Sequence, residues 1–299
     1  MRLESLPADA VEDILTRHGA EAITLSDAAD EPLLEPAPGE TPLWKEVCIA
    51  GLFPASADFA ALETDLLRSL GIPRLPDWSV ETLEDRAWER EWLKDFRPMR
   101  FGRRLWVVPG DQAVPADDAL ILRLDPGLAF GTGTHPTTRL CLEWLEALPL
   151  SQLRVLDFGC GSGILSIAAA LLGARSVVAL DIDHQALIAT RNNARRNGVA
   201  DRIETCDDVA SPAGEFDVIV ANILAATLER NASTICGRLK SGGGLALAGI
   251  LDPQVTSVTG AYREWIDFDA PAADGEWVRL TGTRRQVLAP RDRNVYPVP

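Results

Sequence analysis

The first 80 residues combine apolar positions at helical spacing with short apolar runs that are typical of strands. This pattern predicts helices over residues 7–18 and 58–70 and strands over residues 22–25 and 47–52. Gly19 and Gly71 stand where glycine usually ends a helix. Residues 31–42 are rich in proline and are expected to form a loop. This part of the chain is therefore predicted to be a small α/β domain.

From about residue 105 onward, predicted strands and helices alternate. The strands are expected over residues 154–158, 176–181, 217–221 and 245–248, and the helices over residues 137–147, 164–172, 184–197 and 227–239. Such alternation favours a parallel sheet that helices cover on both faces. Between the two parts, residues 80–96 have the pattern of an amphipathic helix. We expect three regions: an α/β domain over 1–80, a helical linker over 81–105 and a larger α/β domain over 106–299.

Charge is distributed unevenly along the 299 residues. Apolar residues make up 46% and charged residues 24%, which is typical of a folded globular protein. The net charge is −15, and residues 1–85 hold 18 acidic against 5 basic side chains. This balance argues against a general nucleic-acid or acidic-membrane binder, whose affinity depends on basic side chains. The acidic surface of the first domain is either simply solvated or the binding site of a basic partner.

The five cysteines are isolated from one another and from histidines at zinc-site spacing, so we expect reduced thiols and no metal site. The N-terminus lacks the basic start and apolar run of a signal peptide. The longest charge-free stretch, residues 158–174, is broken by glycines and is shorter than a membrane span of about 20 residues. These features predict a cytoplasmic protein that does not contact membranes.

The most informative segment reads VLDFGCGSGIL and covers residues 155–165. A predicted buried strand runs into a turn with glycines at 159, 161 and 163, and then into a helix. Glycines at the end of such a strand let the backbone approach a ligand, although similar turns also serve packing alone. The pattern D-x-G-x-G-x-G differs from the dinucleotide fingerprint and from the P-loop.

Two further strand ends strengthen this reading. Asp181 ends the next predicted strand, where a carboxylate can accept hydrogen bonds from both ribose hydroxyls. Asn222 ends the fourth predicted strand. Together with the glycine turn, these residues look like an S-adenosylmethionine-dependent methyltransferase with a seven-stranded Rossmann-like sheet. A second glycine-rich stretch, residues 239–245, precedes a strand, so we interpret it as a turn without a ligand.

Residues 127–138 form an uncharged stretch that mixes glycines with hydroxyl side chains and contains FGTGTHPTT. Taken with VLDFGCGSGIL, LDID and NILA, this string resembles the bacterial ribosomal protein L11 methyltransferase family. The similarity extends upstream through EPAPGETPLW, WEREW and PMRFG. The resemblance therefore covers both predicted domains.

The resemblance implies a ferredoxin-like N-terminal domain that binds the ribosomal protein. It also implies a C-terminal domain that transfers methyl groups from S-adenosylmethionine to lysine side-chain amines and to the N-terminal α-amine. The family's cofactor contacts fall on Thr138, Gly159, Asp181 and Asn222, with Asn222 also beside the reacting amine. One departure is the stretch 225–228, which reads Ala-Ala-Thr-Leu where the family usually has Ala-Gly-Pro-Leu.

We add Gly161 from the glycine turn and Thr134 from the uncharged loop to the predicted cofactor site, and we assign Asn222 as the catalytic residue. Thr132 or Thr134 is expected to shape the channel to the cofactor. His135 is a candidate base, but beside Pro136 it fits better as a residue of the first helical turn. We expect a monomer that does not bind nucleic acid.

Three alternatives stay open at this point. Methyltransferases that act on planar nitrogens carry Asn-Pro-Pro-aromatic at this strand end, whereas here Asn222 precedes Ile223, Leu224 and Ala225. A lysine methyltransferase that acts on another protein shares the same cofactor motifs. A cofactor-binding scaffold without catalysis is the third possibility, and the complete set of cofactor residues argues against it.

Overall fold

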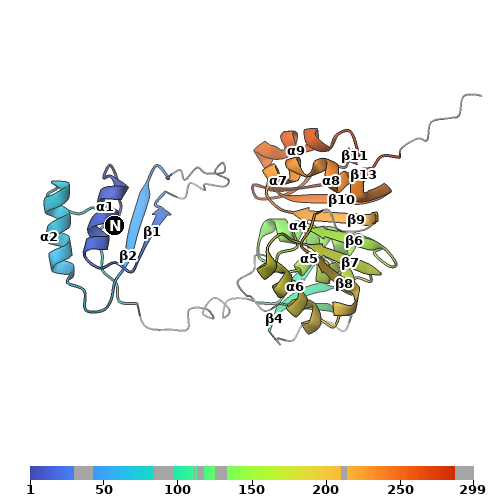
Figure 1. Cartoon of the computed structure of the whole chain (residues 1–299), viewed down its shortest axis with the longest axis horizontal. Coiled ribbons are helices and arrows are strands. Elements are labelled where there is room, and N and C mark those ends of the chain that lie inside the picture. The colour runs from blue at the N-terminus through green and yellow to red at the C-terminus, as the bar shows by residue number, and fades with distance from the viewer. Residues whose placement is uncertain are drawn as a thin grey trace, which may run out of the picture. The chain divides into compact units, whose positions relative to one another are not determined.

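The computed structural model describes residues 1–29, 43–83, 97–110, 112, 118–124, 133–209 and 214–286. The chain forms two compact units, Met1–Ala87 and Trp88–Pro299. In Figure 1 the first unit runs from blue to cyan and the second from teal to red. Within the described residues, no helix is long and apolar enough to cross a membrane. The same residues contain no group of three or more His, Cys, Asp or Glu that is arranged to hold a metal ion.

The first unit contains the four elements that its hydrophobic pattern predicts: α1 (Ala8–Arg17), β1 (Ala22–Asp27), β2 (Val47–Leu52) and α2 (Phe59–Leu70). The strands pair antiparallel, and Arg2 adds an antiparallel bridge to Cys48 on the other edge of β2. The Asp58 carboxylate accepts from the Ala61 amide at 3.0 Å and caps the start of α2, while Gly71 ends it at a φ of 66°. The loop predicted over 31–42 lies outside the described residues.

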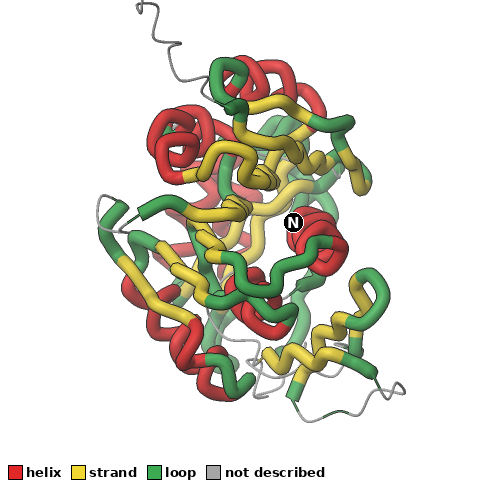
Figure 2. Tube along the Cα trace, turned by 90° about the vertical axis from the view of Figure 1, so that its right-hand side faces the viewer, coloured by secondary structure: helices red, strands yellow, loops and turns green. Residues whose placement is uncertain are grey.

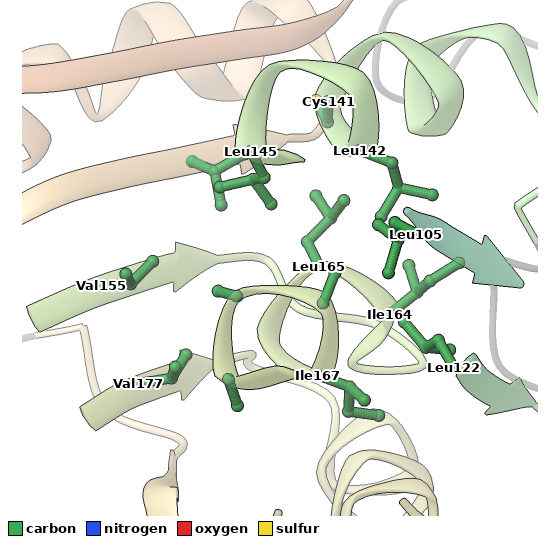
Figure 3. Close-up of a cluster of buried hydrophobic side chains, with 14 of the residues drawn as sticks. Leu105, Leu122, Cys141, Leu142, Leu145, Val155, Ile164, Leu165, Ile167 and Val177 are labelled. Carbon is green, nitrogen blue, oxygen red and sulfur yellow. The ribbon is translucent and has the colours of Figure 1, made fainter. Parts of the chain in front are cut away.

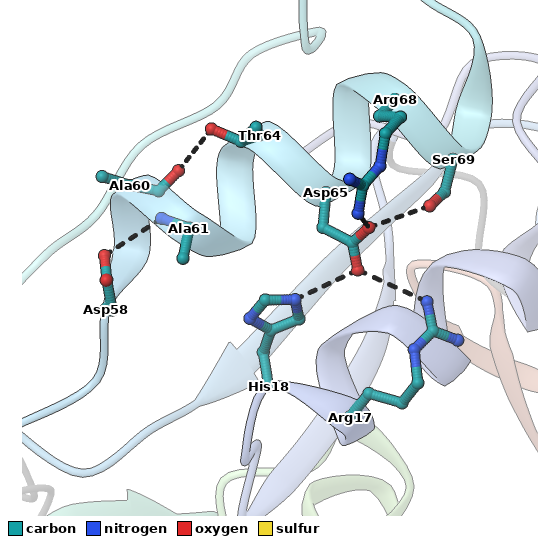
Figure 4. A network of polar contacts seen from close by, with 9 residues as sticks. All are labelled: Arg17, His18, Asp58, Ala60, Ala61, Thr64, Asp65, Arg68 and Ser69. Carbon is teal, nitrogen blue, oxygen red and sulfur yellow. Dashed lines mark hydrogen bonds and ion pairs between the residues drawn. The ribbon is translucent and has the colours of Figure 1, made fainter.

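Polar contacts join the two helices of this unit around Asp65 of α2 (Figure 4). His18 and Arg17, at the end of α1, lie 3.1 and 3.5 Å from one carboxylate oxygen of Asp65. Arg68 and Ser69 contact its other oxygen at 2.7 and 3.1 Å. The hydrogen bonds from Arg68 and His18 hold the pKa of Asp65 well below its usual range. Asp65 therefore fixes the end of α1 against α2.

The second unit is built on a sheet whose main path holds seven strands in the order β11-β13-β10-β9-β6-β7-β8. These strands are β6 (Arg154–Phe158), β7 (Ser176–Leu180), β8 (Ile203–Cys206), β9 (Phe216–Asn222), β10 (Leu239–Leu251), β11 (Ile266–Phe268) and β13 (Trp277–Arg284). Five neighbouring strands, from β10 to β8, are parallel, as expected. The sheet as a whole is mixed, because β13 is antiparallel to both β10 and β11, and β12 (Ala272–Asp274) also pairs antiparallel with β13.

Helices cover both faces of this sheet (Figures 1 and 2). One face packs against α4 (Pro136–Ala147), α5 (Ile164–Leu171) and α6 (His184–Arg196), and the other against α7 (Ala225–Arg230), α8 (Ala232–Arg238) and α9 (Val255–Tyr262). Alternation along β6 divides the two cores: Val155 belongs to the core with α4 and α5, whereas Leu156 and Phe158 belong to the core with α7 to α9.

A small second sheet of β3 (Met99–Phe101), β4 (Leu105–Pro109) and β5 (Leu120–Leu124) packs on the outer side of α4 and α5. Figure 3 shows Leu105 and Leu122 of this sheet beside Leu142 of α4 and Ile164 of α5. The expected helical linker over 81–105 is therefore too long at its C-terminal end, since β3 and β4 belong to the second unit's core. Residues 84–96, which carry the rest of that predicted helix, lie outside the described residues.

Two predicted elements differ from the structure. The single helix expected over 227–239 is two helices, α7 and α8, because Asn231 leaves the helical conformation at φ −100° and ψ 8°. Residues 239–245, predicted as a turn, belong to β10, whose register on β9 shifts between Leu239 and Gly244. We expected the strand to begin after the glycines at 242–244. In the structure it begins before them, and the glycines allow an irregularity inside the strand.

Candidate functional site

The predicted site residues other than Thr134 come together at the carboxyl ends of the central parallel strands. The glycine turn follows β6, Asp181 follows its neighbour β7, and Asn222 ends β9 on the other side of β6. Thr138 joins them from the first turn of α4. Open α/β sheets bind their ligands at this edge, next to the first central strand.

The glycine turn is held rigidly against β7. The amides of Gly159 and Cys160 both donate to the Leu180 carbonyl, at 2.8 and 2.9 Å. Gly159, Gly161 and Gly163 have φ angles of 83°, 53° and 80°, which side chains disfavour. A Cβ on Gly159 would also lie 2.3 Å from Ile223 Cγ2. The turn therefore needs glycine for its conformation and for its close packing.

Asp181 connects the turn to the next strand end. Its Oδ2 accepts from the Gly161 amide at 2.9 Å, and its Oδ1 accepts from the Asp183 amide at 3.0 Å. Each carboxylate oxygen keeps a second lone pair, so both can accept a further hydrogen bond. This arrangement suits two adjacent hydroxyl groups. The neighbouring Ile182 side chain is 80% exposed. Ile182 is not among the site residues predicted from the sequence, although an aliphatic residue directly after Asp181 could have indicated it.

Thr138 and Asn222 form the second pair. The Asn222 Nδ2 lies 3.4 Å from the Thr138 Oγ1, although the two residues are 84 positions apart. Thr138 is buried and Asn222 is half-buried. The interaction of Nδ2 with Thr138 leaves the Asn222 Oδ1 as an acceptor. Thr134 is exposed two residues before α4, and its role stays a prediction, while residues 125–132, with Thr132, lie outside the described residues.

His135 has the structural role that its position beside Pro136 predicts. It is the N-cap of α4: its Nδ1 lies 2.7 Å from the Thr137 Oγ1 and accepts from the Thr137 amide at 3.3 Å. The imidazole also meets the Trp277 ring edge to face, with centroids 4.7 Å apart. Burial lowers the pKa of His135, because it disfavours the charged ring. The geometry favours helix capping over a role as a base.

Asp157 is a buried group whose role the sequence did not indicate, although it is the acidic position of the glycine motif. Its Oδ2 accepts from the amide and the hydroxyl of Ser166 in α5, at 2.9 and 2.6 Å. Its Oδ1 has no hydrogen-bond partner within the described part of the chain. Burial raises the pKa of Asp157 to about 7. Asp157 thus ties the first turn of α5 to the end of β6, directly beneath the glycine turn.

Comparisons with known proteins show which sequences this chain is similar to. A sequence profile described as "Ribosomal protein L11 methyltransferase (PrmA)" matches residues 1–285. The ribosomal protein L11 methyltransferase of Methylococcus capsulatus is 51% identical over 283 residues, which are 93% of this chain and 95% of the relative. That of Idiomarina loihiensis is 47% identical over 277 residues, covering 93% and 94%.

A solved structure shares the fold as well. The crystal structure of the ribosomal protein L11 methylase from Lactobacillus delbrueckii subsp. bulgaricus is similar, with a TM-score of 0.60 and 36% sequence identity. The similarity covers 64% of this chain and all of that one.

Proposed function

The chain belongs to the ribosomal protein L11 methyltransferase family, and from that premise we propose that it methylates lysine side-chain amines and the N-terminal α-amine of ribosomal protein L11. The chemistry of the family is S-adenosylmethionine-dependent methyl transfer. The main support for the proposal is a pair of hydrogen bonds at one edge of the sheet. One joins Gly161 to Asp181, and the other joins Asn222 to Thr138.

The residues at this edge fit S-adenosylmethionine. Asp181 has an acceptor site on each oxygen for the two ribose hydroxyls. The exposed Ile182 offers apolar surface to the adenine ring. Three of the five positions of the turn carry no side chain, and Asn222 ends β9 on the opposite side of β6 from Asp181. We therefore assign Thr134, Thr138, Gly159, Gly161, Asp181 and Asn222 to the cofactor site.

When bound, S-adenosylmethionine supplies a methyl group attached to a positively charged sulfur. The protein chiefly has to align the acceptor amine with that methyl group, and such alignment accounts for up to about 7–11 kcal/mol of a barrier. Asn222 contributes through its Oδ1, which accepts an N–H of the amine and orients the nitrogen lone pair. Thr138 fixes the Asn222 amide by accepting from its Nδ2.

The amine must be neutral to react. A lysine amine has a pKa of about 10.4 in water, so the site has to favour its deprotonated form. Desolvation lowers the pKa of an amine, because burial disfavours the charged state. His135 serves as the N-cap of α4, so we assign the proton to bulk water instead of to a protein base.

The first unit supplies the surface for the protein substrate in this proposal. Residues 1–85 carry a net charge of −13, and complementary charge speeds and orients docking of a basic protein. A cavity of about 540 Å³ in this unit is bordered by the exposed side chains of Leu52, Val80 and Leu83. We propose that ribosomal protein L11 docks on this unit, and that the enzyme acts as a cytoplasmic monomer without nucleic acid.

The experiment that tests the substrate is methylation of a whole ribosomal extract. Labelled S-adenosylmethionine and this protein are added to extract from bacteria that lack their own L11 methyltransferase, and labelled proteins are identified after gel separation. We expect the label in L11. Label in another protein alone would keep the methyl transfer and overturn the proposed substrate, whereas no label with the fully folded protein would overturn the function.

A further inference from the structure

One apolar side chain at the candidate active site is exposed without a structural reason. Leu224 follows Asn222 by two residues, and its side chain is 57% exposed. Leu224 is also the N-cap of α7, a position that Ser, Thr, Asp and Asn favour because their side chains bond to the free amides of the first turn. Leucine makes no such bond and is not buried. It therefore stabilises neither the helix nor the core.

The backbone around Leu224 is fixed relative to Asn222. The Ile223 amide donates to the Ala248 carbonyl at 3.2 Å, and the Leu224 carbonyl accepts from the amides of Thr227 and Leu228 at 2.9 and 3.0 Å. The Ile223 side chain packs over Gly159, where a Cβ would lie 2.3 Å from its Cγ2. The backbone of Leu224 is thus fixed two residues after Asn222, whose side-chain amide we assign to the acceptor amine.

We propose that Leu224 is a substrate-contact residue that packs against the aliphatic stem of the acceptor lysine and removes water from its amine. The inference rests on the proposed function. A lysine side chain carries its ammonium on a flexible stem of four carbons, and apolar contact along that stem holds it in one conformation. Apolar surface next to the amine also lowers its pKa, which raises the fraction of the neutral nucleophile.

The two kinds of acceptor in this proposal respond differently to Leu224. An N-terminal α-amine has no aliphatic stem, and its pKa in water is already about 7.7–8.0, against about 10.4 for lysine. Leu224 should therefore matter for lysine methylation and much less for methylation of the α-amine. This contrast provides an internal control within a single protein substrate.

The test compares wild type with Leu224→Ser, Leu224→Met and, as a matched control, Ile188→Ser, which replaces another exposed aliphatic side chain, on α6. Peptide mass spectrometry of purified L11 follows the initial rates at lysines and at the N-terminus over a range of pH. Serine suits the N-cap position, so Leu224→Ser should melt no earlier than wild type.

We expect Leu224→Ser to lower kcat/KM at lysines about tenfold, which is the effect of a lost apolar contact in a binding pocket, and to change the α-amine rate less than about twofold. The pH dependence of lysine methylation should move to higher pH, while Leu224→Met and Ile188→Ser behave like wild type. Equal losses at both kinds of amine, or no loss at lysines, would overturn the role of Leu224 alone. A wild type that leaves L11 unmodified would overturn the proposed function together with it.

Discussion

Two carboxylates, those of Asp181 and Asp157, have different structural roles at the candidate site. Asp181 accepts one backbone amide on each oxygen, so the group that we assign to the ribose also fixes Gly161 and Asp183. Asp157 lies below the same turn, fully buried, and spends one oxygen on Ser166. We assign the first carboxylate to the ligand, whereas the second holds the first turn of α5 against the end of β6.

Asp157 makes stability depend on pH in a predictable direction. Its folded-state pKa of about 7 lies above the ordinary value of 3.8, because burial disfavours the carboxylate. As the pH rises from about 4 to 7, the unfolded state loses this proton first, so the folded state loses stability over that window at up to about 1.4 kcal/mol per pH unit. Asp157→Asn resembles the protonated carboxyl in shape and does not titrate.

Urea unfolding of wild type and Asp157→Asn at several pH values checks this expectation. The stability of wild type relative to the variant should fall between pH 4 and 7 and level off above. Stability curves for the two proteins that run parallel across this range would contradict the buried, proton-binding state of Asp157.

At the scale of elements, the tight turn between β6 and α5 is constrained both by its backbone conformation and by its packing. A left-handed conformation costs a residue with a side chain roughly 1–2 kcal/mol. We expect Gly159→Ala to destabilise the second unit by more than this amount. The added reason is the approach of Ile223 Cγ2 to 2.3 Å from the new Cβ. The variant should also weaken S-adenosylmethionine binding, since the turn borders the site.

Gly198→Ala is the matched control for that variant. Gly198 follows α6 with a φ of 67°, and a Cβ there meets no atom within 4 Å. Thermal unfolding and cofactor titration of both variants separate backbone strain from close packing. Similar destabilisation in the two variants, or unchanged cofactor binding in Gly159→Ala, would show that Ile223 does not limit this turn.

Elements with a strong local pattern could be predicted from the sequence, and those set by distant contacts could not. Strand β2 and helix α2 have the expected residues because apolar spacing, Asp58 and Gly71 define them locally. The break between α7 and α8 and the early start of β10 could not be predicted. Leu239 follows directly after α8 and is the first residue of β10, because it pairs with Phe216 of β9.

The same distinction applies to the site. The meeting of Gly161 with Asp181, and the place of Asn222 at the neighbouring strand end, follow from the rule that parallel strands present their carboxyl ends at one edge. Thr138 lies on α4 and not on a strand, so its contact with Asn222 does not follow from this rule. The contacts of α4 with the C-terminal strands could not be predicted from the sequence. Trp277 meets His135, and Asp274 lies 3.5 Å from Arg139, through pairs more than 130 residues apart.

At the scale of the whole molecule, we assign the excess of acidic residues to substrate docking. Raising the salt concentration from about 50 to 500 mM shortens the range of electrostatic attraction from about 14 Å to about 4 Å. The KM for L11 should therefore rise about three- to tenfold, while kcat and the Kd for S-adenosylmethionine change little. Steady-state kinetics and cofactor titration at both salt concentrations measure this. A KM that does not respond to salt would contradict docking through the acidic unit.

The most direct test of the central claim is the intact mass of purified ribosomal protein L11 after incubation with this protein and S-adenosylmethionine. Asp181→Asn serves as the site variant, and Asp183→Ala, which removes only the cap of α6, serves as its control. We expect mass gains in steps of about 14 Da with wild type and with Asp183→Ala. Asp181→Asn should lose most of this gain, because charge-assisted hydrogen bonds contribute about 1.5–3 kcal/mol each. An L11 mass that stays unchanged with wild type, or equal gains with Asp181→Asn, would contradict that claim.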